Sequence, residues 1–237
     1  MTMSNPKPTM IEVRELAKTF VLHARGATIP VFADIGFDVD AGECLVLAGP
    51  SGIGKSTLLR SLYANYRPQR GSIRVRHGGG WVDLAAAQPH EVLDVRRRAI
   101  GYVSQFLRVI PRVTTRDLVA EPLVALGLDA DVARARAEAL LLRLNIPAPL
   151  WSLPPATFSG GEQQRVNLAR VFVVDYPIYL LDEPTASLDA ENRAIVVALL
   201  VEARNRGAAM VGIFHDREVR AEVGTRTLDL ADLQRAA

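Results

Sequence analysis

One short stretch, GPSGIGKS at residues 49–56, constrains the fold of this chain more than any other feature. An apolar run, Cys44 to Leu47, precedes it, and a segment with leucines at helical spacing, Lys55 to Tyr66, follows it. The stretch fits the pattern G-x-x-x-x-G-K-[ST]. Glycines allow the backbone to curl, so that successive N–H groups at the start of a helix point into one cavity and bind phosphate oxygens. The order of strand, glycine loop and helix therefore predicts a phosphate-binding site in an α/β fold.

The same pattern assigns roles to the residues that close this loop. Lys55 is expected to reach the β- and γ-phosphates of a nucleotide, and Ser56 to offer its hydroxyl to Mg²⁺. The alternative interpretation is a glycine turn that happens to precede a lysine, but the position between a strand and a helix makes that coincidence rarer. We expect the nucleotide to contact Gly49, Pro50, Ser51, Gly52, Ile53, Gly54, Lys55, Ser56 and Thr57.

The rest of the chain alternates between strand-like and helix-like segments. Strands are expected at residues 11–13, 19–22, 31–39, 44–47, 73–76, 81–84, 100–104, 178–181 and 209–214. Helices are expected at residues 55–66, 115–125, 130–144, 190–206 and directly after the serine and glycines at 159–161. Strands that alternate with helices favour a parallel α/β sheet. The helices between 115 and 144 are interpreted as an insertion into it.

The composition limits the classes of partner. The 237 residues carry a formal net charge of +2, which is too small to steer the protein strongly toward nucleic acid or anionic lipid. The one cysteine, Cys44, allows no internal disulfide and is typical of a reducing compartment. No apolar signal core and no apolar run of ~18 residues is found. We expect a soluble, cytoplasmic protein with no direct membrane insertion and no nucleic-acid partner, in which the Arg96-Arg97-Arg98 run is a solvated face.

Four polar residues stand where predicted strands end, namely Asp182, Glu183, Gln105 and His215. Polar side chains at the carboxyl ends of parallel strands line the ligand crevice of such sheets. Asp182 is placed to hold a metal-bound water. Glu183 is expected to point elsewhere, because side chains alternate along an extended chain, and to accept a proton from an attacking water. His215 and Gln105 are weak signals when taken alone, since a lone histidine is more often structural.

The stretch FSGGEQQR, residues 158–165, opens a further helix with a serine and two glycines. Such a start presents backbone N–H groups to an anion, although a serine by itself is an ordinary helix cap. A plain cap does not need two glycines, each of which weakens a helix by ~1 kcal/mol relative to alanine. Because the phosphate loop already serves this chain's own site, we expect Ser159, Gly160 and Gly161 to approach the nucleotide of another subunit.

In chain order, GPSGIGKST, Gln105, FSGGEQQR, YLLDEPTASLD and His215 resemble the motifs of ATP-binding cassette (ABC) ATPases over nearly the whole chain. The resemblance implies an ATPase that uses ATP and Mg²⁺. It also implies two cassettes that meet head to tail, with ATP between the phosphate loop of one and the Ser-Gly-Gly of the other. By the same resemblance Phe20 stacks on adenine, Gln105 links the nucleotide to a partner protein, and the loop ending at Asp189 crosses the interface.

The resemblance also implies the site residues. Catalytic roles fall to Lys55, Glu183 and His215. Outside residues 49–57, the nucleotide is expected to contact Phe20, Gln105, Ser159, Gly160, Gly161 and Asp189. The metal ligands are expected to be Ser56, Gln105 and Asp182. Phe20, Phe158 and Glu162 depart from the family's usual tyrosine, leucine and glutamine. A carboxylate suits the first turn of a helix, but it also repels a nearby phosphate, which leaves open whether Glu162 lowers activity.

The resemblance implies an α/β P-loop NTPase of the ABC type, with an N-terminal antiparallel β-subdomain and an inserted α-helical subdomain. We expect a single domain over residues 1–237. The β-subdomain is expected at 10–40 and 68–85, and the P-loop core at 42–67, 98–105 and 165–237. The helical subdomain is expected at 106–164, ending in the FSGGE motif.

Longer phrases favour one branch of the family. LLRSLYANYRPQRGSI, VSQFLRVIPRVT, TFSGGEQQRVNLARVFVVDYPI and GAAMVGIFHD are closely similar to the cassette (L) subunit of the carbon–phosphorus lyase system. That resemblance implies phosphonate degradation, with the lyase core enzymes and a second ABC subunit as partners in forming ribose 1-phosphonate 5-triphosphate. The alternative is the ATPase of a lipoprotein-release or macrolide-export transporter, suggested by Ile110-Pro111-Arg112-Val113-Thr114. The sequence does not decide between a homodimer and a heterodimer. It also leaves open how ATP hydrolysis is coupled to the partner and which phosphonates are substrates.

Overall fold

The computed structural model describes residues 7–22, 27–105, 107 and 112–232. Its strands are β1 Thr9–Leu22, β2 Ala27–Asp40, β3 Cys44–Ala48, β4 Arg70–His77, β5 Gly80–Asp83, β6 Ile100–Val103, β7 Ile178–Asp182, β8 Ala209–Ile213 and β9 Arg226–Asp229. Its α-helices are α1 Lys55–Leu62, α2 Pro89–Arg98, α3 Thr115–Ala125, α4 Ala130–Arg143, α5 Gly160–Phe172, α6 Ala190–Asn205 and α7 Arg217–Val223. Short 3-10 turns lie at Ala148–Leu150 and Pro155–Thr157.

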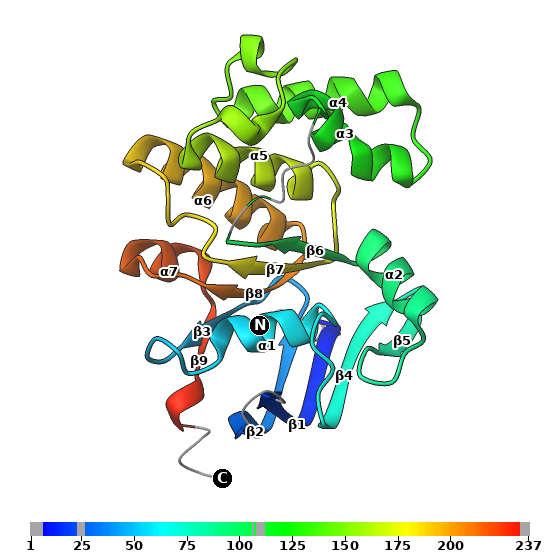
Figure 1. Ribbon diagram of the computed structural model, residues 1–237, viewed down its shortest axis with the longest axis vertical. Coiled ribbons are helices and arrows are strands. Elements are labelled where there is room, and N and C mark those ends of the chain that lie inside the picture. Colours follow the sequence, from blue (N-terminus) through cyan, green and yellow to red (C-terminus); the bar gives the residue numbers. More distant parts are fainter. Residues whose placement is uncertain (1–6, 23–26, 106, 108–111, 233–237) are drawn as a thin grey trace, which may run out of the picture.

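The strands form two sheets. A 4-stranded antiparallel sheet has the order β2-β1-β4-β5, and a 5-stranded parallel sheet has the order β6-β7-β8-β3-β9. Figure 1 shows the parallel sheet in the middle of the molecule, with α3, α4 and α5 on one side and the antiparallel sheet on the other. The predicted fold class, with an N-terminal antiparallel part and an inserted helical part, is therefore confirmed. The expected subdomain boundaries stay a prediction.

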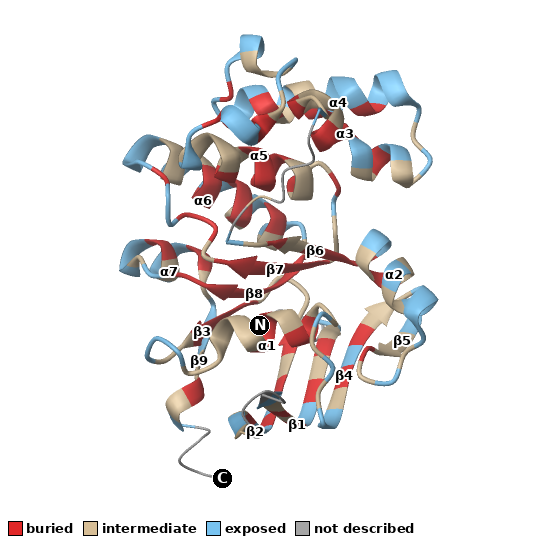
Figure 2. Ribbon diagram, in the orientation of Figure 1, coloured by how far each residue is buried: buried red, intermediate tan, exposed pale blue. Residues whose placement is uncertain are grey.

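The parallel sheet separates two apolar clusters of the core. Along β7, Tyr179 and Leu181 pack with the layer formed by α3, α4, α5 and α6, whereas Ile178 and Leu180 pack with α1 and the antiparallel sheet. Every residue of β7 is buried, as Figure 2 shows by its colour. A strand that is covered on both faces has a nearly continuous apolar sequence, which in β7 is interrupted only by Asp182 at its end. This is why the sequence predicts β3, β7 and β8 correctly.

The N-terminal strands differ from the prediction. Residues 11–13 and 19–22 belong to one strand, β1, which pairs with β2 from Thr9 opposite Asp40 to Leu22 opposite Ala27. The pairing register shifts between Val13 and Leu16, and Glu15 between them has a left-handed φ of 48°. Residues 11–13 and 19–22 are thus joined across a β-bulge, which adds a residue to one strand without ending it.

Among the α-helices and strands of the described residues, α2, α7 and β9 were not predicted. For α2 a signal was present in the sequence, because Gln88 and Glu91 form a reciprocal capping box and Pro89 stands at the first helical position. Of the Arg96 to Arg98 run, which was expected to be a solvated face, Arg97 and Arg98 are exposed and Arg96 is half-buried. Its Nε donates to the Tyr63 carbonyl oxygen at 2.8 Å, and its guanidinium lies 4.5 Å from the centre of the Tyr63 ring.

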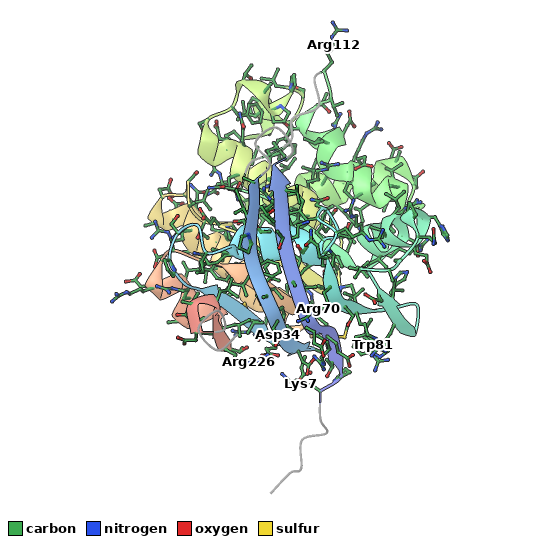
Figure 3. All side chains as sticks on the ribbon, turned by 60° about the horizontal axis from the view of Figure 1, so that its bottom comes forward. Lys7, Asp34, Arg70, Trp81, Arg112 and Arg226 are labelled. Atoms are coloured by element: carbon green, nitrogen blue, oxygen red, sulfur yellow. The ribbon has the colours of Figure 1, made fainter. Side chains whose placement is uncertain are left out.

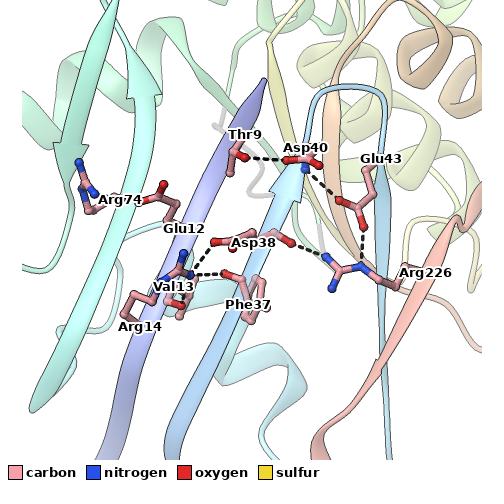
Figure 4. A network of polar contacts seen from close by, with 10 residues as sticks. All are labelled: Thr9, Glu12, Val13, Arg14, Phe37, Asp38, Asp40, Glu43, Arg74 and Arg226. Atoms are coloured by element: carbon pink, nitrogen blue, oxygen red, sulfur yellow. Dashed lines mark hydrogen bonds and ion pairs between the residues drawn. The ribbon is translucent and has the colours of Figure 1, made fainter. Parts of the chain in front are cut away.

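Strand β9 ties the two sheets together through a network of polar side chains (Figure 4). Arg226 on β9 pairs with Glu43 at 2.6 Å and donates to the carbonyl oxygen of Asp38 on β2. The carboxylate of Asp38 in turn pairs with Arg14 on β1 at 2.5 Å. Figure 3, in which the antiparallel sheet faces the reader, shows Arg226 beside this sheet. These contacts join the last parallel strand to the first two antiparallel strands.

None of the helices in the described part of the chain combines the length and the apolar character of a membrane span. Of the phrase Ile110-Pro111-Arg112-Val113-Thr114 that suggested a transporter, the first two residues lie outside the described residues.

Candidate nucleotide-binding site

The phosphate loop, residues 49–56, joins β3 to α1 at the carboxyl end of the parallel sheet. Gly49, Gly52 and Gly54 take left-handed φ angles of 124°, 81° and 107°. Gly54 is the N-cap residue of α1, and no side chain caps that end of the helix. The N–H groups of the first turn of α1 are therefore left for an acceptor from outside the helix, which suits an anion.

Lys55 bends back over the loop to which it belongs. Its Nζ donates to the carbonyl oxygens of Gly49 at 2.7 Å and Pro50 at 2.9 Å. Both of these acceptors are neutral. The positive charge of Lys55 thus stands at the mouth of the loop, where it attracts the oxygens of a phosphate chain.

The loop is supported by strands of both sheets. A Cβ atom at Gly54 would lie 2.6 Å from Cγ1 of Val31 on β2, which is closer than any real contact. A Cβ atom at Gly49 would lie 3.3 Å from Oδ1 of Asp229 on β9. Glycine is therefore required at Gly54 both by its φ and by the strand that packs against it.

Ser56 and Asp182, two of the predicted metal ligands, lie together. The Ser56 hydroxyl donates to Oδ1 of Asp182 at 3.0 Å, and the Tyr102 hydroxyl donates to Oδ2 at 3.3 Å. Asp182 is only 1% exposed, and this burial raises its pKa, while the hydrogen bonds from Ser56 and Tyr102 act in the opposite direction. Burial, together with the charge of Asp182, raises the pKa of Tyr102 to about 12.

Glu183 lies between Gln105 and His215, so the residues that end β6, β7 and β8 meet as the sequence predicts. Its Oε1 is 2.7 Å from Nε2 of His215, and its Oε2 accepts a hydrogen bond from Nε2 of Gln105 at 3.3 Å. The sequence analysis attributed the orientation of the Glu183 side chain to the alternation of an extended strand, and the structure shows a different cause. Glu183 has a left-handed φ of 55°, so a backbone turn, and not the alternation of an extended strand, directs its side chain away from Asp182.

A hollow of about 340 Å³ opens beside Glu183. It is lined by Glu183, Thr185, Ala186, Arg193, His215 and Asp216. Arg193 pairs with Asp216 at 2.7 Å and donates to the carbonyl oxygen of Leu188 at 3.2 Å. Sequence reasoning missed Tyr102, Thr185 and Arg193, because none of them stands at a strand end or in a glycine-rich turn.

Ser159 does not present unused donors, contrary to the expectation for this helix start. It caps α5 in a reciprocal box with Glu162, whose Oε2 accepts from both the backbone N–H and the hydroxyl of Ser159 at 2.8 Å. These two hydrogen bonds, the hydroxyl first, hold the pKa of Glu162 below its usual range. The carboxylate of Glu162, which replaces the family's usual glutamine, is therefore hydrogen-bonded to Ser159, the residue that was expected to contact the ligand.

The two glycines after Ser159 differ in their surroundings. A Cβ atom at Gly161 would lie 2.9 Å from the carbonyl oxygen of Ser187, in the loop that ends at Asp189. A Cβ atom at Gly160 would have no neighbour within 4 Å. Close approach of the chain's own backbone therefore explains Gly161, and only Gly160 is left facing open space.

The remaining predicted residues are placed as follows. Asp189 is exposed and caps α6 by accepting from the backbone N–H of Asn192 at 2.9 Å, a bond that lowers the pKa of Asp189. Phe20 is half-buried on β1, with its ring edge-on to Tyr66 at 5.2 Å and with Nζ of Lys18 4.9 Å from its centre. The roles of both residues toward a nucleotide stay predictions.

The donor set fits Mg²⁺. Mg²⁺ prefers oxygen ligands and keeps several waters or phosphate oxygens when it is bound through one or two protein groups. The hydroxyl of Ser56 and the carboxylate of Asp182 supply such oxygens. Within the described ranges no group of three or more His, Cys, Asp or Glu side chains forms a metal cage. The amide nitrogen of Gln105 is directed to Glu183, so its part in holding the metal stays a prediction.

Comparisons with known proteins agree with this geometry. Residues 32–186 match the family model described as ABC transporter. The chain is 37% identical over 196 residues to the arginine transport ATP-binding protein ArtP of Escherichia coli, an alignment that covers 82% of this chain and 80% of ArtP. It is 34% identical over 229 residues to the macrolide export ATP-binding/permease protein MacB of Marinobacter nauticus. That alignment covers 96% of this chain but only 34% of MacB.

Among solved structures, the chain is similar to a dimeric structure of a post-hydrolysis state of the ATP-binding cassette MJ0796 bound to ADP and Pi. The TM-score is 0.84 and the sequence identity 27%, over 94% of this chain and 95% of MJ0796.

Proposed function

Because the chain belongs to the ABC transporter family and is an ATPase that uses ATP and Mg²⁺, we propose that it is the nucleotide-hydrolysing subunit of a membrane transporter. The observation that carries the chemistry is the meeting of Gln105, Glu183 and His215 beside the Ser56–Asp182 pair. The similarity to MacB, which extends over 96% of this chain, favours a permease of the macrolide-export type as the partner.

In this proposal the first task of the chain is to hold the triphosphate. The N–H groups at the start of α1 and the Nζ of Lys55 surround its oxygens. Ser56 and Asp182 hold Mg²⁺, which neutralises charge on the β- and γ-phosphates when bound. Asp182 suits this role because it is already held on both oxygens by hydroxyl donors.

The second task is proton transfer from water. Glu183 accepts the proton of the attacking water, since a carboxylate next to the phosphate loop is the general base that the site offers. His215 holds Oε1 of Glu183 at 2.7 Å and steadies the γ-phosphate with its exposed ring. Gln105 donates to the other oxygen of Glu183. Through this contact it transmits to the partner protein whether the site holds ATP or its products.

We infer that the site is completed by a second cassette. The His215 side chain is 66% exposed, and a Cβ atom at Gly160 would meet open space, so both residues are accessible to another subunit. The dimeric state of MJ0796 supports pairing. In the proposed pair, Ser159 and Gly160 of one cassette face the phosphate loop of the other. Closing on ATP and opening after hydrolysis make the pair a two-state clamp.

A second candidate is the cassette of the carbon–phosphorus lyase system, with lyase enzymes as partners and phosphonate degradation as the role. It is supported by the four long phrases, including TFSGGEQQRVNLARVFVVDYPI, that are similar to its L subunit. The sequence ranked this candidate first. The relatives described above are named for transport, and they support the alternative better, so the order is reversed. The transport proposal places the chain at the cytoplasmic face of a membrane, held there by its partner.

The two candidates differ in the protein that accompanies this chain. Tagged Glu183→Gln protein, which is expected to bind ATP and hydrolyse it slowly, is recovered with ATP from cells that use a phosphonate as sole phosphorus source. We expect an integral membrane protein to be recovered, and only from detergent-solubilised membranes. Lys55→Ala protein, which lacks the phosphate-binding ammonium, is the matched control and should recover less of it. Recovery of phosphonate-processing enzymes without detergent contradicts the transport proposal and supports the lyase candidate.

A further inference from the structure

A cluster of aromatic and guanidinium side chains reaches Asp182 through the Tyr102 hydroxyl. It consists of Arg60, Tyr63, Tyr66 and Tyr102, called here the Arg60 cluster. Tyr102 is the member that touches Asp182. It stands on β6, opposite Leu180 of β7, and so reaches Asp182 from the neighbouring strand. The sequence analysis assigned no role in the site to any of these four residues.

The two oxygens of Asp182 have different donors. Ser56 donates to Oδ1 at 3.0 Å and Tyr102 donates to Oδ2 at 3.3 Å. Because Asp182 is 1% exposed, water does not replace a lost donor freely. The carboxylate therefore does not rotate without breaking one of the two bonds, and its orientation is fixed from both sides.

Arg60 gives the Tyr102 hydroxyl a direction. Arg60 lies on α1, one helical turn after Ser56, and its guanidinium interacts with the hydroxyl of Tyr102. Its Nη1 also lies 3.3 Å from the Tyr66 hydroxyl. A guanidinium has only donors. The Tyr102 hydroxyl donates its proton to Oδ2 of Asp182, and the positive charge of Arg60 near this hydroxyl favours that direction. A chain of this kind strengthens each of its members.

Packing alone does not explain a tyrosine at this position. The Tyr102 ring lies against the Tyr63 ring, with 4.9 Å between centres and a tilt of 32°. A phenylalanine makes the same ring contact and carries no polar group that needs a partner. The hydroxyl instead points to a buried carboxylate, where it restrains an anion that burial disfavours.

We propose that Tyr102 is a positioning residue for the metal site. Its hydroxyl, oriented by Arg60, holds Oδ2 of Asp182 so that Oδ1 remains beside Ser56, where the metal is expected. This rests on the proposed function only in the assignment of Mg²⁺ to Ser56 and Asp182. Residues that orient a metal ligand from behind typically change metal affinity when they are replaced.

The test measures the metal contribution to nucleotide binding and not turnover. The dissociation constant of the slowly hydrolysed analogue AMP-PNP is measured by calorimetry in excess Mg²⁺ and again in EDTA, for the full chain. The ratio of the two values is the gain due to the metal. For Tyr102→Phe we expect this gain to fall about tenfold. We expect no change in the EDTA value and none in the melting temperature.

Tyr66→Phe is the matched control. It also removes a phenol hydroxyl that faces Arg60, but this hydroxyl does not donate to Asp182. We expect its metal gain to equal that of the wild type. The variant Asp182→Asn distinguishes an error in the assignment of the metal site from an error in the role of Tyr102. If Asp182→Asn keeps the full gain, the metal site itself is wrongly assigned. If Asp182→Asn loses the gain and Tyr102→Phe keeps it, the metal site stands and the positioning role of Tyr102 is overturned.

Discussion

At the level of single residues, two neighbouring glycines, Gly160 and Gly161, are present for different physical reasons. Gly160 and Gly161 both look like glycines kept for a ligand. The structure gives Gly161 a reason inside the chain, because the Ser187 carbonyl oxygen approaches to 2.9 Å of where a Cβ would be. Gly160 has no such neighbour. Gly160 is therefore the glycine of the two that no neighbour in the chain explains, and contact of Gly161 with a nucleotide stays a prediction.

This difference predicts opposite effects of two alanine substitutions. Gly160→Ala adds a methyl group in open space and removes a helix-weakening glycine, so the melting temperature should stay the same or rise by up to about 2–4 °C. Its ATP turnover should fall at least about tenfold, because the methyl group stands where the partner's nucleotide is proposed to lie. Gly161→Ala should lower both the melting temperature and the turnover, since the Ser187 backbone must move.

Differential scanning fluorimetry and a phosphate-release assay on the two variants check this pair. Wild-type turnover in Gly160→Ala would remove the reason for placing a ligand at this helix start. An undisturbed melting temperature in Gly161→Ala would show that the Ser187 loop yields without cost.

At the scale of elements, the phosphate loop depends on strands far from it in sequence. Val31 on β2 lies against Gly54, and Asp229 on β9 lies against Gly49. Arg226 and Glu43 join β9 to the region of β2, as Figure 4 shows. The loop is therefore supported by both sheets and not by β3 and α1 alone.

The contact with β2 predicts that Gly54→Ala is more damaging than Gly52→Ala. Both positions have a left-handed φ, at 107° and 81°, so both variants pay a backbone cost of about 1–2 kcal/mol. Only Gly54→Ala also forces a Cβ atom against Val31, at 2.6 Å. Its melting temperature should fall further than that of Gly52→Ala. Adding Val31→Ala to Gly54→Ala should restore part of the difference.

Thermal unfolding of the two single variants and the double variant decides the matter. Equal losses in Gly52→Ala and Gly54→Ala, with no recovery on adding Val31→Ala, mean that β2 does not support the loop.

The sequence predicts the elements whose own residues carry a signal, and it does not predict features that depend on how strands pair. Strands β3, β7 and β8 were predicted because burial on both faces makes their sequences continuously apolar. The bulge in β1 was not, because it depends on pairing with β2 and on a left-handed Glu15, neither of which leaves a periodic signal. The same limit explains Tyr102. Its hydroxyl matters only because β6 lies next to β7, which the sequence of β6 does not reveal.

At the scale of the whole molecule, the predicted residues gather at one edge of the parallel sheet but leave it incomplete. Glu183 is 20% exposed at its side chain, whereas His215 next to it is 66% exposed. Ser159 is held by its own Glu162. Ser159 and Gly160, which the family resemblance assigned to a partner's nucleotide, are exposed. In the proposed pair, two copies arranged head to tail would bring both halves of the site together.

The most direct test of this account is the mass of the protein in solution, measured by sedimentation velocity with and without ATP. Glu183→Gln removes the proposed base, so hydrolysis should slow by on the order of 10²–10⁴ while ATP still binds. The account predicts that this variant is a monomer without nucleotide and sediments as a pair of copies with ATP and Mg²⁺. Adding Ser159→Arg should leave ATP binding intact and abolish the pair. A Glu183→Gln protein that stays monomeric at saturating ATP, or an equally stable pair with Ser159→Arg, contradicts the proposal that ATP is held between two copies of this chain.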